Sequence, residues 1–141
     1  MQEQEVPMEH ATKQFRKRNA ILSCLRSTTS HPSAEMVHDM LQQDHPDISL
    51  ATVYRNLSLF KTQGIIQSLG MIHGIERFDG NTEPHVHFVC NCCSDIQDLM
   101  QMDAPQRLCS EAAHHIGGQV DSCQLMFFGT CQRCLAKRDL A

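Results

Sequence analysis

The chain has 141 residues, of which 41% are hydrophobic, and it carries a formal net charge of -4. This length suits one compact domain or two small ones, with enough apolar residues for their cores. No apolar run reaches the length of a membrane span, and the N-terminus, MQEQEVPMEH, has neither the basic start nor the apolar stretch of a secretory signal. We therefore expect a cytoplasmic protein with no membrane partner.

The charges are distributed unevenly along the chain. Lys13, Arg16, Lys17 and Arg18 fall within six residues of each other, whereas acidic residues dominate the second half. This asymmetry fits a module that binds a polyanion joined to a module that binds cations.

The first two predicted helices are marked by apolar residues at helical spacing. The first helix should run from about residue 10 to residue 26, with the basic cluster in its first turns. Its apolar stripe consists of Phe15, Ile21, Leu22 and Leu25. The second helix should begin after the N-cap Ser33, and its apolar residues are Met36, Val37, Met40 and Leu41.

The third predicted helix begins at the N-cap Ser49 and stops at Gly64. Its exposed face carries small, hydrogen-bonding residues and Arg55, which suits insertion into a DNA major groove, although an ordinary surface helix would look the same. Two short strand-like runs around residues 70–74 then predict a hairpin. Three helices and a hairpin predict a winged helix-turn-helix, with its third helix in the major groove and its first helix near phosphates.

The second half predicts a small α+β unit. Strands are expected at residues 85–90, 95–99 and 119–128. Between the last two strands, a helix capped by Asp103 should end at Gly117. The expected domains are a DNA-binding domain over residues 1–80, a hinge over residues 81–84, and a dimerisation and metal-binding domain over residues 85–141.

Potential metal ligands fall into two sets. His85 and His87 lie two residues apart, so an extended strand would project both imidazoles from one face toward a shared cation. The second set is two C-x-x-C pairs, formed by Cys90, Cys93, Cys131 and Cys134. Four thiolates in this arrangement predict a closed structural Zn²⁺ site, with a disulfide switch as the main rival.

Four separated motifs occur in a familiar order: HPSAE at 31–35, ATVYRNL at 51–57, HVHFVC at 85–90, and the two C-x-x-C pairs. From about residue 10 to residue 135 the chain resembles the ferric uptake regulator (Fur) family of bacterial metal-dependent repressors. The resemblance implies a winged helix followed by a small α/β dimerisation domain. It also implies a homodimer bound to palindromic double-stranded operator DNA, and no enzymatic activity. The residues expected at the DNA are Lys13, Arg16, Lys17, Arg18, Ser49, Thr52, Tyr54 and Arg55.

The resemblance also implies a regulatory site for Fe²⁺ or Mn²⁺, with His31, Asp79, His85, His87 and Asp98 as ligands. Aspartate at both acidic positions is similar to the peroxide-sensing (PerR) branch of the family, whereas iron-sensing members more often have glutamate there. In that branch, peroxide reacting with the iron-loaded protein oxidises a ligand imidazole, here His31 or His85. The repressor then releases its operator.

Two other functions remain open from the sequence. The first is an iron- or zinc-responsive repressor of the same fold that does not sense peroxide. The second is a non-haem iron enzyme, because two histidines and a carboxylate also form a facial triad. The enzyme is the less favoured of the two, since no segment is left over to build a pocket for an organic substrate.

Overall fold

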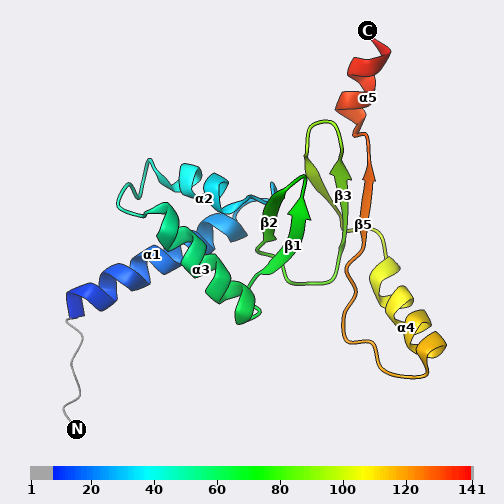
Figure 1. The fold of residues 1–141 in the computed structure, drawn as a ribbon, viewed down its shortest axis with the longest axis horizontal. Helices are drawn as coiled ribbons and strands as arrows, with labels where there is room; N and C mark the ends of the chain where they lie inside the picture. Colours follow the sequence, from blue (N-terminus) through cyan, green and yellow to red (C-terminus); the bar gives the residue numbers. More distant parts are fainter. Residues whose placement is uncertain (1–7, 141) are drawn as a thin grey trace. The chain divides into compact units, whose positions relative to one another are not determined.

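The computed structural model describes residues 8–140, and the chain divides between Thr82 and Glu83 into two compact units. Within the described residues, unit 1 contains α1–α3 and the hairpin β1–β2, and unit 2 contains β3–β5, α4 and α5 (Figure 1). The division point lies inside the predicted hinge at residues 81–84. None of the described helices combines the length and apolar character needed to traverse a bilayer.

Two of the three helices of unit 1 begin at their predicted caps, and the first begins at Met8 rather than at about residue 10. They are α1 (Met8–Arg26), α2 (Ala34–Leu41) and α3 (Leu50–Thr62). Ser33 Oγ accepts a hydrogen bond from the Met36 amide at 3.2 Å, and Ser49 Oγ accepts one from the Thr52 amide at 3.2 Å. Both predicted N-caps are confirmed, because each side chain satisfies an amide that the first helical turn leaves without a partner.

The core of unit 1 contains half of the apolar residues predicted for the first two helices. Its buried members from the three helices include Ile21, Leu25, Val37, Leu41, Val53, Leu57 and Phe60. Three predictions were wrong: Phe15 is 64% exposed, Met36 is 39% exposed and Met40 is 47% exposed. From residue 12 of α1 onward, where side chains are described, burial begins at Ile21, so α2 and α3 cover the C-terminal part of the helix and leave Phe15 outside.

The predicted hairpin is confirmed as β1 (Gln67–Ile72) paired antiparallel with β2 (Ile75–Asp79). Its two-residue loop, His73 and Gly74, has φ values of 50° and 82°, the left-handed geometry that matches the twist of a tight hairpin. Directly after β2 comes Gly80, where an added Cβ would lie 3.0 Å from the Arg26 Cα and the Leu25 carbonyl oxygen. Glycine is needed there because the chain passes against the end of α1.

Unit 2 is built on a sheet with the strand order β4-β3-β5. The strands are β3 (Val86–Cys90), β4 (Ile96–Leu99) and β5 (Met126–Gly129), with β3 antiparallel to β4 and parallel to β5. The predicted strand at residues 119–128 was wrong in extent, because only its last three residues belong to β5. Among the described strands, β5 pairs with β3 alone, and the five-residue β3 is too short to pair with the segment that precedes β5.

Two helices complete unit 2. α4 (Ala104–Ile116) ends at Gly117, as predicted, and this glycine is in the left-handed conformation; Pro105 lies in the first turn. Asp103 occupies the N-cap position, as predicted, but its side chain makes no capping hydrogen bond. The sequence analysis missed α5 (Gln132–Asp139), because the stretch QRCLAKRD has no apolar stripe. The fold is therefore α+β, a winged helix-turn-helix unit followed by a small sheet unit.

Candidate metal centres and nucleic-acid interface

The four cysteines of the two C-x-x-C pairs form one cluster, here called the zinc cluster. Parallel pairing of β3 with β5 aligns Cys90 with Gly129 and so delivers Cys131 beside Cys90. The four sulfur atoms lie within 4.8 Å of one another, and Cys93 Sγ is 3.8 Å from Cys131 Sγ. Tetrahedral Zn–S bonds of about 2.3 Å place sulfurs about 3.8 Å apart, so the cluster fits Zn²⁺. All eight cysteines are free thiols, so the cluster contains no disulfide.

The backbone around the zinc cluster favours thiolates. The Cys131 amide donates a hydrogen bond to Cys90 Sγ at 3.3 Å. This bond, with further backbone amides of the first knuckle, lowers the pKa of Cys90 to about 6. Contact with the neighbouring Cys131 sulfur, together with burial, raises the pKa of Cys134 to about 12. A cation is therefore needed to balance the charge when all four sulfurs are ionised. A structural metal provides that charge.

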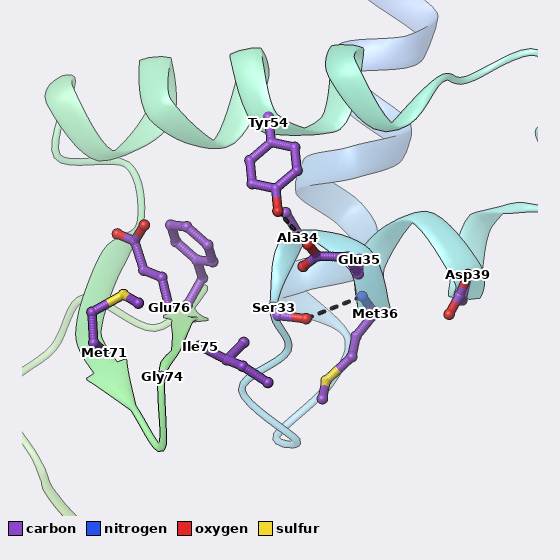
Figure 2. A pocket seen from close by; sticks show the side chains of 11 residues that line it. Ser33, Ala34, Glu35, Met36, Asp39, Tyr54, Met71, Gly74, Ile75 and Glu76 are labelled. Carbon is purple, nitrogen blue, oxygen red and sulfur yellow. Dashed lines mark hydrogen bonds between the residues drawn. The ribbon is translucent and has the colours of Figure 1, made fainter.

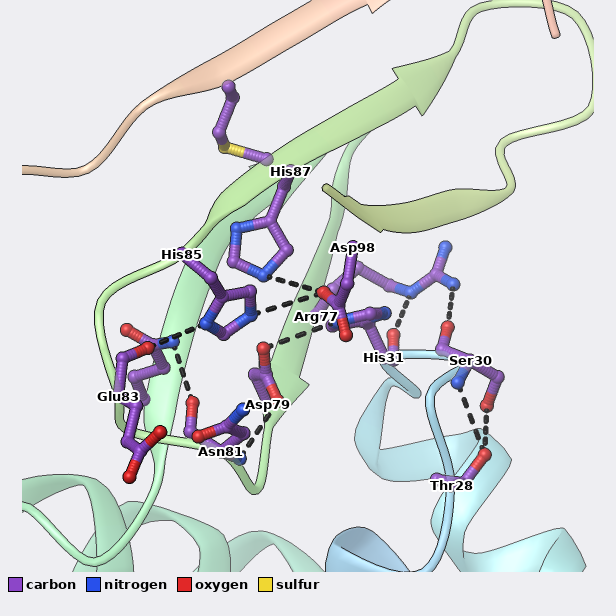
Figure 3. A network of polar contacts seen from close by, with 12 residues as sticks. Thr28, Ser30, His31, Arg77, Asp79, Asn81, Glu83, His85, His87 and Asp98 are labelled. Carbon is purple, nitrogen blue, oxygen red and sulfur yellow. Dashed lines mark hydrogen bonds and ion pairs between the residues drawn. The ribbon is translucent and has the colours of Figure 1, made fainter. Parts of the chain in front are cut away.

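Unit 2 also brings together His85, His87 and Asp98, here called the unit 2 trio. The β3–β4 register sets His87 opposite Asp98, and Asp98 Oδ1 lies 3.1 Å from His85 Nε2 and 3.3 Å from His87 Nε2 (Figure 3). The imidazole centroids are 4.3 Å apart, which confirms that both rings project from one face. His85 Nδ1 donates to the Glu83 carbonyl at 2.6 Å, leaving the Nε2 lone pair available to a metal.

Unit 1 pairs a third histidine with a second aspartate. His31 Nε2 lies 3.2 Å from Asp79 Oδ2, and both residues are buried (Figure 3). His31, in the loop before α2, has φ 52°, a left-handed conformation that costs a non-glycine residue about 1–3 kcal/mol. Nitrogen and oxygen donors of this kind are the ligands that Fe²⁺, Mn²⁺ and Zn²⁺ accept in proteins. The pair His31 and Asp79 is here called the unit 1 pair.

Five of the eight predicted DNA-contacting residues line one groove between α1 and α3, with a volume of about 630 Å³. They are Lys13, Lys17, Arg18, Thr52 and Arg55. The groove also contains Asn56, which the sequence analysis missed, although it lies one helical turn after Thr52. This basic groove has the charge and the hydrogen-bonding side chains that a DNA backbone requires.

The other three predicted DNA contacts are engaged elsewhere in unit 1. Arg16 pairs with the Asp47 carboxylate, and Ser49 caps α3. The Tyr54 hydroxyl donates to the Glu35 carboxylate at the edge of a second cavity, of about 470 Å³, between α2 and the hairpin (Figure 2). That hydrogen bond lowers the pKa of Glu35 and raises the pKa of Tyr54.

A winged helix joined to a sheet unit with a four-cysteine cluster defines a class of metal-binding transcription regulators. The family model of the ferric uptake regulator family matches residues 9–128, and the chain belongs to this family. The peroxide-responsive repressor PerR of Staphylococcus aureus is 37% identical over 123 residues, which cover 86% of this chain and 81% of that protein.

Solved structures agree with this assignment. The Campylobacter jejuni peroxide stress regulator has a TM-score of 0.81 and 27% identity, covering 95% of this chain and 100% of its own. The Pseudomonas aeruginosa ferric uptake regulator with manganese has a TM-score of 0.68 and 26% identity, covering 82% and 87%. Members of the family are metal-responsive repressors that bind DNA as dimers, and they are regulators rather than enzymes. The facial-triad enzyme therefore loses its support.

Proposed function

We propose that the protein is a peroxide-responsive repressor that binds palindromic operator DNA as a homodimer in the cytoplasm, where the chromosome lies. The observation that carries the proposal is the presence of histidine–aspartate groups with buried imidazoles in both units, namely the unit 1 pair and the unit 2 trio. The Staphylococcus aureus and Campylobacter jejuni relatives, both named for their response to peroxide, support it.

In this proposal the unit 1 pair and the unit 2 trio share one Fe²⁺ or Mn²⁺. Three imidazoles and two carboxylates suit either cation, and the Pseudomonas aeruginosa relative was solved with manganese. Since the ligands come from both units, a shared cation would fix the DNA-binding unit relative to the dimerisation unit. Metal binding and operator binding are then linked, so each strengthens the other.

Peroxide sensing would act on the imidazoles themselves. Fe²⁺ held by these residues would supply the one-electron chemistry that turns hydrogen peroxide into an oxidant of a neighbouring ligand. A ring that gains an oxygen atom is a poorer nitrogen donor, and His31 and His85 are the rings we expect to be modified. With one imidazole lost, the remaining ligands, including Asp79 and Asp98, would bind the cation too weakly to keep the two units linked. The operator would then be released.

The dimer is supported by apolar side chains that unit 2 leaves exposed. Two apolar residues of α4 are not buried within the chain, since Leu108 is 40% and Ile116 is 66% exposed. Other exposed apolar residues of unit 2 include Met100, Met102, Phe127, Phe128 and Leu135. A second copy of the chain covering this surface would account for their exposure.

The proposed function is tested by loading the protein with Fe²⁺, Mn²⁺ or Zn²⁺ and measuring operator affinity with and without hydrogen peroxide. Operator duplexes would first be selected from a random pool with the Mn²⁺-loaded protein. We expect peroxide to weaken binding by the iron-loaded protein roughly 5- to 150-fold, the usual range of coupling between sites. Mass spectrometry should find one added oxygen on a peptide containing His31 or His85. The Mn²⁺-loaded protein should stay unmodified and bound.

If the iron-loaded protein keeps both its affinity and its unmodified histidines, peroxide sensing is ruled out. Operator binding that still depends on Fe²⁺ or Zn²⁺ would then identify an iron- or zinc-responsive repressor.

The basic groove makes a separate prediction for DNA binding. Lys17→Ala should reduce the slope of log affinity against log salt concentration by about 1, because one phosphate contact and its released counterion are lost. Arg16→Ala is the matched control, since the Arg16 guanidinium is engaged with Asp47. Fluorescence anisotropy over a series of salt concentrations measures both slopes. Equal slopes for Lys17→Ala and the unmodified protein would place the phosphates outside this groove.

A further inference from the structure

The His31 loop is bonded to a buried arginine that the sequence analysis did not single out. Arg77, on β2, is 6% exposed, and its guanidinium donates from Nε to the His31 carbonyl and from a terminal nitrogen to the Ser30 carbonyl at 2.9 Å. We propose that Arg77 is a positioning residue that presents His31 to the regulatory cation. This inference rests on the proposed function, because it assigns Arg77 a role at the same site.

The two hydrogen bonds act on the two peptide groups that flank the His31 Cα. The Ser30 carbonyl belongs to the peptide group before His31, whose orientation relative to the residue is described by φ. The His31 carbonyl belongs to the peptide group after it, whose orientation is described by ψ. One planar guanidinium that binds both carbonyls therefore restrains both backbone angles of a single residue (Figure 3).

The restraint matters because His31 adopts a conformation that it would not otherwise favour. Its φ of 52° lies in the left-handed region. A non-glycine residue stays in this region only when the surrounding structure holds it there. The next peptide is held as well, since the Phe78 amide donates to the Pro32 carbonyl at 3.0 Å. Released from these bonds, the loop would relax toward negative φ and carry the imidazole away from Asp79.

Strand β2 supplies both parts of this arrangement. Arg77 and Asp79 are two residues apart and both buried, so alternation along the strand places their side chains on the same face. Arg77 binds the His31 backbone, while Asp79 Oδ2 lies 3.2 Å from the His31 imidazole. The unit 1 pair is thus assembled entirely from residues of unit 1.

Arginine suits this position better than lysine. The guanidinium is planar and presents its N–H donors in a fixed fork, whereas an ammonium is a compact charge on a flexible stem. Arg77→Lys keeps the charge but cannot hold two carbonyls in the same geometry. Arg77→Gln keeps an amide donor without the charge and serves as a second variant, in case the lysine variant does not fold.

The test is a Mn²⁺ titration of the full-length, zinc-replete protein, well below its melting temperature and with folding verified by circular dichroism. We expect Arg77→Lys to weaken Mn²⁺ binding about 10- to 100-fold, the usual effect of losing a group that orients a metal ligand. Arg26→Lys, at an exposed arginine in the same unit, is the matched control and should leave the affinity unchanged. Zinc content should be the same in all variants.

A double-mutant cycle separates this inference from the proposed function. If Arg77 acts through His31, Arg77→Lys should weaken Mn²⁺ binding in the unmodified protein but add no further loss to His31→Ala. An unchanged affinity in Arg77→Lys, or a full additional loss in the His31→Ala background, would overturn the role of Arg77 while leaving His31 as a ligand. An unchanged affinity in His31→Ala would instead overturn the proposed ligand set.

Discussion

Cys131→Ser is expected to release the structural zinc and unfold the second unit. Serine keeps the size of the side chain but is not a thiolate ligand, so the zinc cluster would retain three of its four sulfurs. In small zinc-dependent domains the apparent zinc-binding free energy is about 10–16 kcal/mol, and it contributes directly to folding. Unit 2 has short strands and many exposed apolar residues, so little else would compensate for the loss.

Cys92→Ser is the matched control for this prediction. Cys92 lies between the two ligands of the first knuckle but is exposed and outside the zinc cluster. Metal analysis should find zinc in Cys92→Ser and not in Cys131→Ser, and thermal melting followed by circular dichroism should show early unfolding only in the latter. A Cys131→Ser protein that lacks zinc yet melts normally would show that the metal is not structural.

Asp98→Asn is expected to abolish metal-dependent operator binding while leaving zinc in place. One oxygen of Asp98 lies within 3.3 Å of both imidazoles of the unit 2 trio, so the substitution removes the negative charge that would face the cation. Asparagine has nearly the same shape, so the β3–β4 pairing should survive. Loss of a group that only hydrogen-bonds to a metal ligand reduces affinity roughly 10- to 100-fold. We expect Mn²⁺ affinity to fall by more than this, because Asp98 itself would bind the cation.

Gln97→Ala is the control for this second prediction. Gln97 is the neighbouring residue on β4 and is exposed, so its side chain points to the opposite face of the sheet. Isothermal titration with Mn²⁺ and anisotropy with operator DNA should separate the two variants. Normal Mn²⁺-dependent DNA binding by Asp98→Asn would remove Asp98 from the proposed ligand set.

Local chemistry made part of the fold and site predictable. Ser33 and Ser49 were identifiable as caps because an N-cap depends only on the amides two or three residues ahead. His85 and His87 were predicted to share a face because strand periodicity requires it. The C-x-x-C spacing indicated metal binding by a similar short-range argument. Each of these features involves residues within a few positions of one another, so no knowledge of the tertiary fold was needed.

Features that depend on distant segments were not predictable in the same way. The Arg16 guanidinium pairs with Asp47, which lies 31 positions away, and no local spacing indicated this ion pair. The helix at the C-terminus was missed because Gln132–Asp139 has no apolar stripe, although Cys131 at its N-cap and basic residues in its last turn mark its limits. The strand predicted at residues 119–128 is shorter than expected, because a strand extends only as far as the strand with which it pairs.

By itself, the sequence determined which side chains are available as metal ligands and which short segments carry them. Tertiary structure decided how those ligands combine: the β3–β4 register sets Asp98 opposite His87, and parallel pairing of β3 with β5 brings Cys131 to Cys90. It also revealed Arg77, whose role depends on two carbonyls 46 and 47 positions earlier in the chain. The physical reason is that strand register and buried hydrogen bonds are set by packing across the whole unit, which no local spacing records.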